Sequence, residues 1–115
     1  MTTIDKLVDL IRQTSSSLSD DVVAALKRAK AREQASSSAA VVLSTILDNI
    51  ALAKKISAPL CQDTGTLTFF VDISLRRRVT VKLLQKAVAA ATERGYLRKN
   101  TINSVTGASC DDNCA

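Results

Sequence analysis

The residues best suited to chemistry lie in one stretch, Ala58–Thr66, which holds the only proline of the chain and one of its three glycines. Here Cys61 is followed by an amide, Gln62, and a carboxylate, Asp63. A thiolate binds soft metals such as the iron of iron–sulfur clusters, and the two polar side chains could orient a polar substrate. From these residues alone, an inert buried cysteine beside an Asp-Thr-Gly turn is the alternative.

A second candidate is the pair Cys110 and Cys114, which lie four residues apart. They could chelate a metal with Cys61 as a third ligand, although common metal motifs space their cysteines more closely. We predict instead that residues 108–115 form a flexible polar tail. The chain has no histidine, so the commonest general base and the commonest zinc ligand are both missing.

A third candidate is Arg98, which follows the expected end of a helix at Gly95. A single arginine in this position can hold a carboxylate through two parallel hydrogen bonds. An ordinary solvated surface arginine is the alternative.

Length and composition limit the architecture that must position these residues. With 115 residues, of which 46% are hydrophobic and only 3% aromatic, the chain can build one core of aliphatic side chains. No apolar run reaches the length of a membrane span, and the first residues lack the layout of a signal peptide. Three cysteines are too few for a disulfide framework, so we expect a cytoplasmic protein without a membrane partner.

The net charge of +5 is compatible with a nucleic acid or an anionic substrate. The basic residues form two groups, Lys27–Arg32 and Arg76–Arg78, and no stacking aromatic side chains are interleaved with them. We therefore predict solvated basic faces and no nucleic-acid partner.

Hydrophobic periodicity predicts about four helices. The first spans Thr3–Thr14 and ends at the serine run that follows, the second is capped by Ser19, the third spans Ser38–Ile56, and the fourth is capped by Thr80. The second helix has a narrow apolar face and is expected at the surface. The third is the most apolar and is expected to be the central packing helix.

A strand is predicted directly after the Cys61 turn, because Leu67, Phe69, Val71 and Ile73 alternate with more polar positions. One strand cannot form a sheet. Either residues 96–105 supply a second strand, or the missing strands lie outside this chain. The predicted fold class is thus α/β, rich in helix, and an incomplete part of a larger domain.

Several motifs together resemble one enzyme family. They are Asp20–Lys27, Leu47–Ile50, Pro59–Thr66, Phe69–Val71 and Gly95–Asn100. Along essentially its whole length, residues 1–115, the chain resembles the N-terminal part of the alpha subunit of iron–sulfur-dependent class I hydro-lyases. These are the class I fumarate hydratases and the L(+)-tartrate dehydratases, and Phe69–Val71 is closer to the tartrate dehydratase branch.

The resemblance implies a four-iron, four-sulfur cluster with Cys61 as one of its three thiolate ligands. It implies substrate contacts from Gln62 and Asp63, and a substrate carboxylate held by Arg98. The implied reaction is the reversible addition of water to a C4 dicarboxylate, in which the open iron acts as a Lewis acid on the substrate hydroxyl. No catalytic base is assigned to this chain, because the base of the family comes from elsewhere.

The resemblance also implies partners. The other two cluster cysteines of the family come from later sequence, and Cys110 and Cys114 fall on positions that are threonine-like in the family. We therefore expect the isolated chain to be inactive, and to work with a beta subunit or C-terminal region in a hetero-oligomer. The alternative is a truncated, non-catalytic helical interaction module, in which Cys61→Ala would leave partner binding unchanged.

Overall fold

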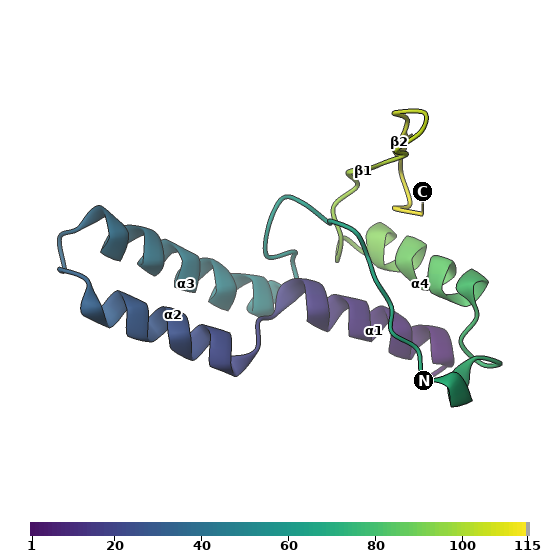
Figure 1. Cartoon of the computed structure of the whole chain (residues 1–115), viewed down its shortest axis with the longest axis horizontal. Helices are drawn as coiled ribbons and strands as arrows, with labels where there is room; N and C mark the ends of the chain where they lie inside the picture. The colour runs from purple at the N-terminus through teal and green to yellow at the C-terminus, as the bar shows by residue number, and fades with distance from the viewer. Residues whose placement is uncertain (115) are drawn as a thin grey trace.

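The computed structural model describes residues 1–114 and shows a helix-rich chain with one small antiparallel sheet, which confirms the predicted fold class (Figure 1). In chain order the elements are α1 (Thr3–Ser16), α2 (Asp20–Arg32), α3 (Ser38–Ile56), the 3-10 helix η1 (Ile73–Leu75), α4 (Val81–Glu93), β1 (Thr101–Ile102) and β2 (Ser109–Cys110). Helices α1 and α4 pack side by side, whereas α2 and α3 form a hairpin that projects as an arm, the α2–α3 arm. Within the described residues, no helix is both long enough and apolar enough to cross a bilayer.

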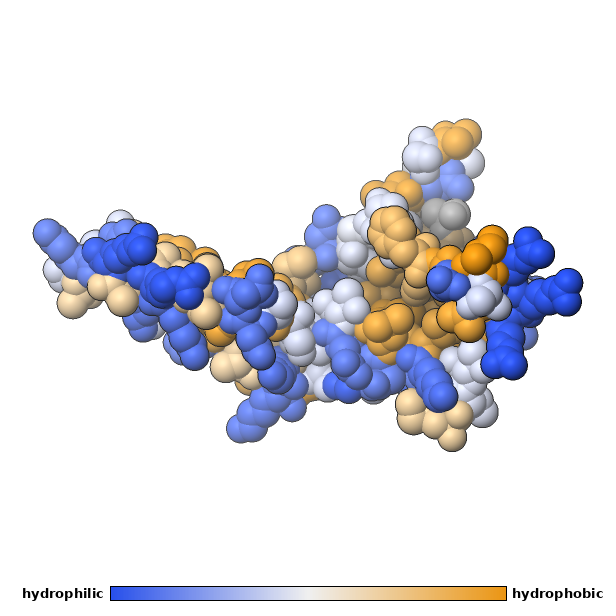
Figure 2. All heavy atoms as spheres, turned by 60° about the horizontal axis from the view of Figure 1, so that its bottom comes forward, coloured by the Kyte–Doolittle hydropathy of each residue, from blue (hydrophilic) through white to orange (hydrophobic). Residues whose placement is uncertain are grey.

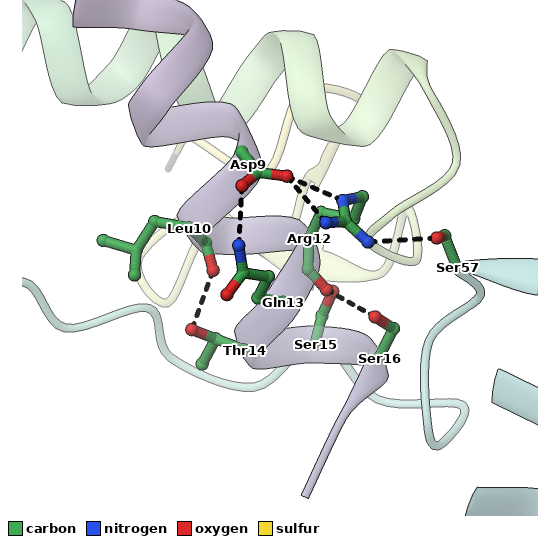
Figure 3. A network of polar contacts seen from close by, with 8 residues as sticks. All are labelled: Asp9, Leu10, Arg12, Gln13, Thr14, Ser15, Ser16 and Ser57. Carbon is green, nitrogen blue, oxygen red and sulfur yellow. Dashed lines mark hydrogen bonds and ion pairs between the residues drawn. The ribbon is translucent and has the colours of Figure 1, made fainter. Parts of the chain in front are cut away.

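Local capping explains where the helices begin. The side chains of Thr2, Ser37 and Thr80 each accept a hydrogen bond from a backbone N–H of the first turn of α1, α3 and α4. The predicted bounds of α3 are confirmed. Helix α1 runs two residues beyond the predicted end, because the hydroxyls of Ser15 and Ser16 donate to the Arg12 carbonyl instead of competing with the helix (Figure 3).

The core lies between α1 and α4. It is formed by Val8 and Ile11 of α1, by Ala87, Val88 and Ala91 of α4, and by Leu97. Two of the α4 contacts are alanines with no exposed surface, so the two helix backbones can approach closely.

The prediction that α3 is the central packing helix is wrong. It packs mainly on α2, and Val41, Val42, Leu52 and Ile56 are each more than half exposed. The apolar residues of α3 extend over more of its circumference than one neighbouring helix can cover. The surface location predicted for α2 is confirmed, since none of its residues is buried.

The predicted strand over residues 67–73 is extended backbone without a ladder, and its last residue, Ile73, begins η1. Among the described residues, the only sheet is formed by β1 and β2. Residues 96–105 do contain a strand, β1, but β1 pairs with β2, with Thr101 opposite Cys110 and Ile102 opposite Ser109.

A polar network joins the end of α1 to the end of α3 (Figure 3). Asp9 accepts from the Arg12 guanidinium at 2.7 Å and from the Gln13 amide at 2.6 Å, and these bonds, that of Arg12 first, lower the pKa of Asp9. Arg12 also donates to the Ser57 hydroxyl at 3.2 Å, and Ser57 ends α3 in the left-handed conformation. The network fixes the chain where it enters the Cys61 loop.

Candidate functional site

The candidate site is built on the loop 58–66, here called the Cys61 loop. Its first half is fixed at Leu60, whose N–H donates to the Ser15 carbonyl at 2.9 Å. The Leu60 carbonyl accepts from the side-chain amide of Asn49 in α3, also at 2.9 Å. Helices α1 and α3 therefore both position the residue directly before Cys61.

Cys61 itself is exposed, and its thiol donates to the Asp63 carbonyl at 3.1 Å. The Asp63 carboxylate accepts from the N–H of Gly65 at 2.9 Å, which closes a short turn. Gly65 has a φ of 67°, so a left-handed residue is needed where the loop reverses. The turn presents one accessible sulfur beside a fixed carboxylate.

Asn100 holds the second half of the Cys61 loop. Its side-chain nitrogen donates to the Gln62 carbonyl, and its side-chain oxygen accepts from the Thr64 N–H at 3.2 Å. The Thr64 hydroxyl donates to the Arg98 carbonyl at 2.6 Å. Three hydrogen bonds thus join two segments that lie more than 30 residues apart in the sequence.

A buried asparagine supports this junction from the other side. Asn113 is 8% exposed and donates to the Arg98 carbonyl at 2.7 Å and to the Thr92 hydroxyl at 3.0 Å. Its side-chain oxygen accepts from the Thr101 N–H at 3.1 Å. The Arg98 carbonyl therefore accepts from both the Cys61 loop and the C-terminal segment. Flexibility of residues 108–115 stays a prediction.

The fold brings the sequence-predicted site residues into one neighbourhood through their backbones. Gln62 and Asp63 share the Cys61 loop, Arg98 lies across the Thr64 hydrogen bond, and all three side chains are exposed. Sequence reasoning assigned no role to Asn100 or Asn113. Asn100 ends the Gly95–Asn100 motif, which was a usable signal, whereas no local pattern distinguished Asn113.

A metal site formed by the three cysteines together, the less favoured possibility for Cys110 and Cys114, is not found among the described residues. Among residues 1–114, no group of three or more histidine, cysteine, aspartate or glutamate residues is arranged to hold a metal. Cys114 instead donates to the Gln85 carbonyl at 3.3 Å, and burial followed by the Asp112 charge raises the pKa of its thiol. Cys61 fits a cluster as a single exposed ligand on a hydrogen-bonded loop.

A hollow of about 530 Å³ lies next to the Cys61 loop, between Gly65–Phe69 and the hairpin that carries β1. None of the residues that line it is a lysine or arginine. The hollow therefore offers no cationic side chain to a carboxylate.

A family model described as fumarate hydratase (fumerase) matches residues 4–114. The chain belongs to the fumarate hydratase family. It is 40% identical over 111 residues to a putative class I fumarate hydratase of Geobacillus stearothermophilus, an alignment that covers 95% of this chain and 22% of the relative. It is 34% identical over 106 residues to the alpha subunit of L(+)-tartrate dehydratase of Escherichia coli K12, with 86% and 35% covered. The chain thus spans about a third or less of the relatives it matches.

Proposed function

We propose that this chain is the N-terminal portion of the alpha subunit, or alpha region, of an iron–sulfur hydro-lyase that adds or removes water on a C4 dicarboxylate. The observation that carries the proposal is the hydrogen-bonded junction between the Cys61 loop and the Arg98–Asn100 segment. It joins the loop that carries Cys61 and Asp63 to the backbone carbonyl of Arg98. Membership of the fumarate hydratase family supports the same reaction class.

In this proposal each exposed side chain of the junction has one task. Cys61 is the only cluster ligand from the described residues, and the bound cluster supplies a Lewis acid for the substrate hydroxyl. Arg98 holds a substrate carboxylate through its two parallel N–H groups. Gln62 and Asp63 orient the substrate, and the hydrogen bond from Gly65 keeps the Asp63 carboxylate in place.

The remaining parts of the active site come from outside the described residues. They are the two further cluster thiolates and the base that removes the C–H proton. The partner is a beta subunit or a C-terminal region of the same enzyme, in a hetero-oligomer, and one matched relative is itself named as an alpha subunit. The exposed Cys61 thiol favours the cytoplasm, because a reducing compartment keeps a ligand thiolate from forming disulfides.

The test is co-expression of this chain with the part of the Geobacillus stearothermophilus relative that it does not match, followed by anaerobic loading with iron and sulfide. We expect hydration of fumarate or dehydration of L-tartrate from the pair and from neither polypeptide alone. Arg98→Ala should raise KM for the dicarboxylate about tenfold or more, whereas Arg94→Ala, an exposed arginine at the end of α4, should not. Full activity of the isolated chain, or equal KM values for the two variants, would refute the proposal.

A further inference from the structure

The segment 66–71, between the Cys61 loop and η1, has the properties of a strand without a partner. Leu67 and Phe69 pack against the core cluster of α1 and α4, whereas the other four residues of the segment are exposed. Among residues 1–114, no backbone N–H or carbonyl of this segment makes a hydrogen bond. An extended backbone with free donors and acceptors is a template for pairing with another strand.

The outer side of this segment carries one large apolar side chain. Phe70 is 97% exposed, which is unusual for a large apolar side chain at the surface of a folded monomer. Figure 2 shows apolar atoms gathered at the surface on the side of the molecule away from the α2–α3 arm. A solvent-facing phenylalanine next to unpaired backbone points to a surface that another polypeptide covers.

The size of the whole surface leads to the same conclusion. The chain exposes 8264 Å², whereas a compact monomer of this length exposes about 6,100 Å². Its radius of gyration is 17.1 Å, against about 13 Å for a compact domain. This excess of about 2,200 Å², to which the projecting α2–α3 arm contributes, is larger than the roughly 800 Å² that each partner buries in a standard interface, so the chain has room for a partner polypeptide.

We propose that residues 66–71 form a β-strand that is completed by an extended strand from the part of the fumarate hydratase-type enzyme that lies outside this chain. The proposal rests on the proposed function in one respect, the identity of the partner. Thr66 follows Cys61 by only five residues, so a strand paired here brings its polypeptide next to the Cys61 loop, where further ligands are required. A second copy of this chain is the less suitable partner, because it would supply only one further Cys61, whereas the proposed cluster needs two further thiolates.

The test uses the co-expressed pair described above and measures amide hydrogen exchange by mass spectrometry. We expect exchange in residues 66–71 to slow about tenfold or more in the pair relative to the chain alone. Phe70→Ser should weaken the pair by about 30-fold and leave the melting temperature of the isolated chain unchanged. Val105→Ser is the matched control, because Val105 is 91% exposed but lies in the hairpin, and it should not weaken the pair.

The outcomes separate this proposal from the proposed function. If the pair forms and hydrates its substrate while residues 66–71 exchange as fast as in the chain alone, the strand proposal is overturned and the function stands. If the segment is protected but the loaded pair is inactive, the function fails and the strand proposal stands. If the pair does not form, or if residues 66–71 are already protected in a homodimer of this chain, the proposed partner strand is wrong.

Discussion

Removing the Asn100 side chain tests whether the Cys61 loop is held by the hydrogen bonds described above. Asn100→Ala deletes one bond to the Gln62 carbonyl and one from the Thr64 N–H. Each bond contributes about 0.5–1.5 kcal/mol net, and because Asn100 is exposed we expect the two together to contribute about 1–2 kcal/mol. The open form of the loop should then be about 5- to 30-fold more populated.

The assay is hydrogen exchange of the Thr64 amide by NMR, because this amide donates directly to Asn100. Exchange should accelerate by the same 5- to 30-fold in Asn100→Ala. In Asn100→Asp the oxygen acceptor remains but the donor to Gln62 is lost, so the acceleration should be smaller. The melting temperature should change little, since the bonds lie outside the core.

Asn103→Ala is the matched control. Like Asn100, Asn103 makes two side-chain hydrogen bonds to the backbone, accepting from the N–H groups of Val105 and Thr106, but it does so in the β1–β2 hairpin. Its removal should leave Thr64 exchange unchanged. If Thr64 exchanges equally fast in the wild type and in Asn100→Ala, the loop is not held by Asn100, and our account of the junction is refuted.

Three further predictions concern stability and reactivity. Asn113→Ala should lower the free energy of unfolding in urea by about 2–4 kcal/mol. It removes three hydrogen bonds, leaves the Thr101 N–H without its acceptor and puts alanine at a φ of 58°. A loss below 1 kcal/mol would contradict this prediction. The pKa of Asp9 is lowered in the folded state, so its hydrogen bonds stabilise the fold above about pH 4 and are lost as the pH falls through the folded-state pKa. Asp9→Asn should therefore make the free energy of unfolding depend less on pH below 4. An unchanged pH dependence in this range would argue against the network. Cys114 is half-buried and the pKa of its thiol is raised, so it should react with iodoacetamide at pH 7.5 more slowly than the exposed Cys61. Faster labelling of Cys114 would be inconsistent with its hydrogen bond to the Gln85 carbonyl.

The sequence predicted the helices well because local interactions determine their ends. Ser37 and Thr80 cap the first turns of α3 and α4, and Gly95 takes the left-handed conformation after α4, as the residue types suggest. Packing was less predictable. Apolar content alone suggested that α3 lies at the centre, but the small, closely packed residues of α4, such as Ala87, make the core.

The strand prediction shows the same division between local and non-local information. The alternation put Leu67, Phe69, Val71 and Ile73 on one apolar face. Leu67 and Phe69 do pack against the core, whereas Val71 and Ile73 are exposed. The alternation did not determine hydrogen-bond pairing, which depends on another backbone. The candidate site shows the same division. The Pro59–Thr66 motif indicated Cys61, whereas the hydrogen bonds of Asn100 and Asn113 depend on contacts between segments that are distant in the sequence.

The central claim is that Cys61 is a ligand of an iron–sulfur cluster in a hydro-lyase. The most direct measurement is the iron and acid-labile sulfide content of the co-expressed pair after anaerobic loading, compared among the wild type, Cys61→Ser and Cys110→Ser. We predict four irons and four sulfides per pair in the wild type and in Cys110→Ser, and loss of most of both in Cys61→Ser. A full and equally stable cluster in Cys61→Ser would contradict the claim.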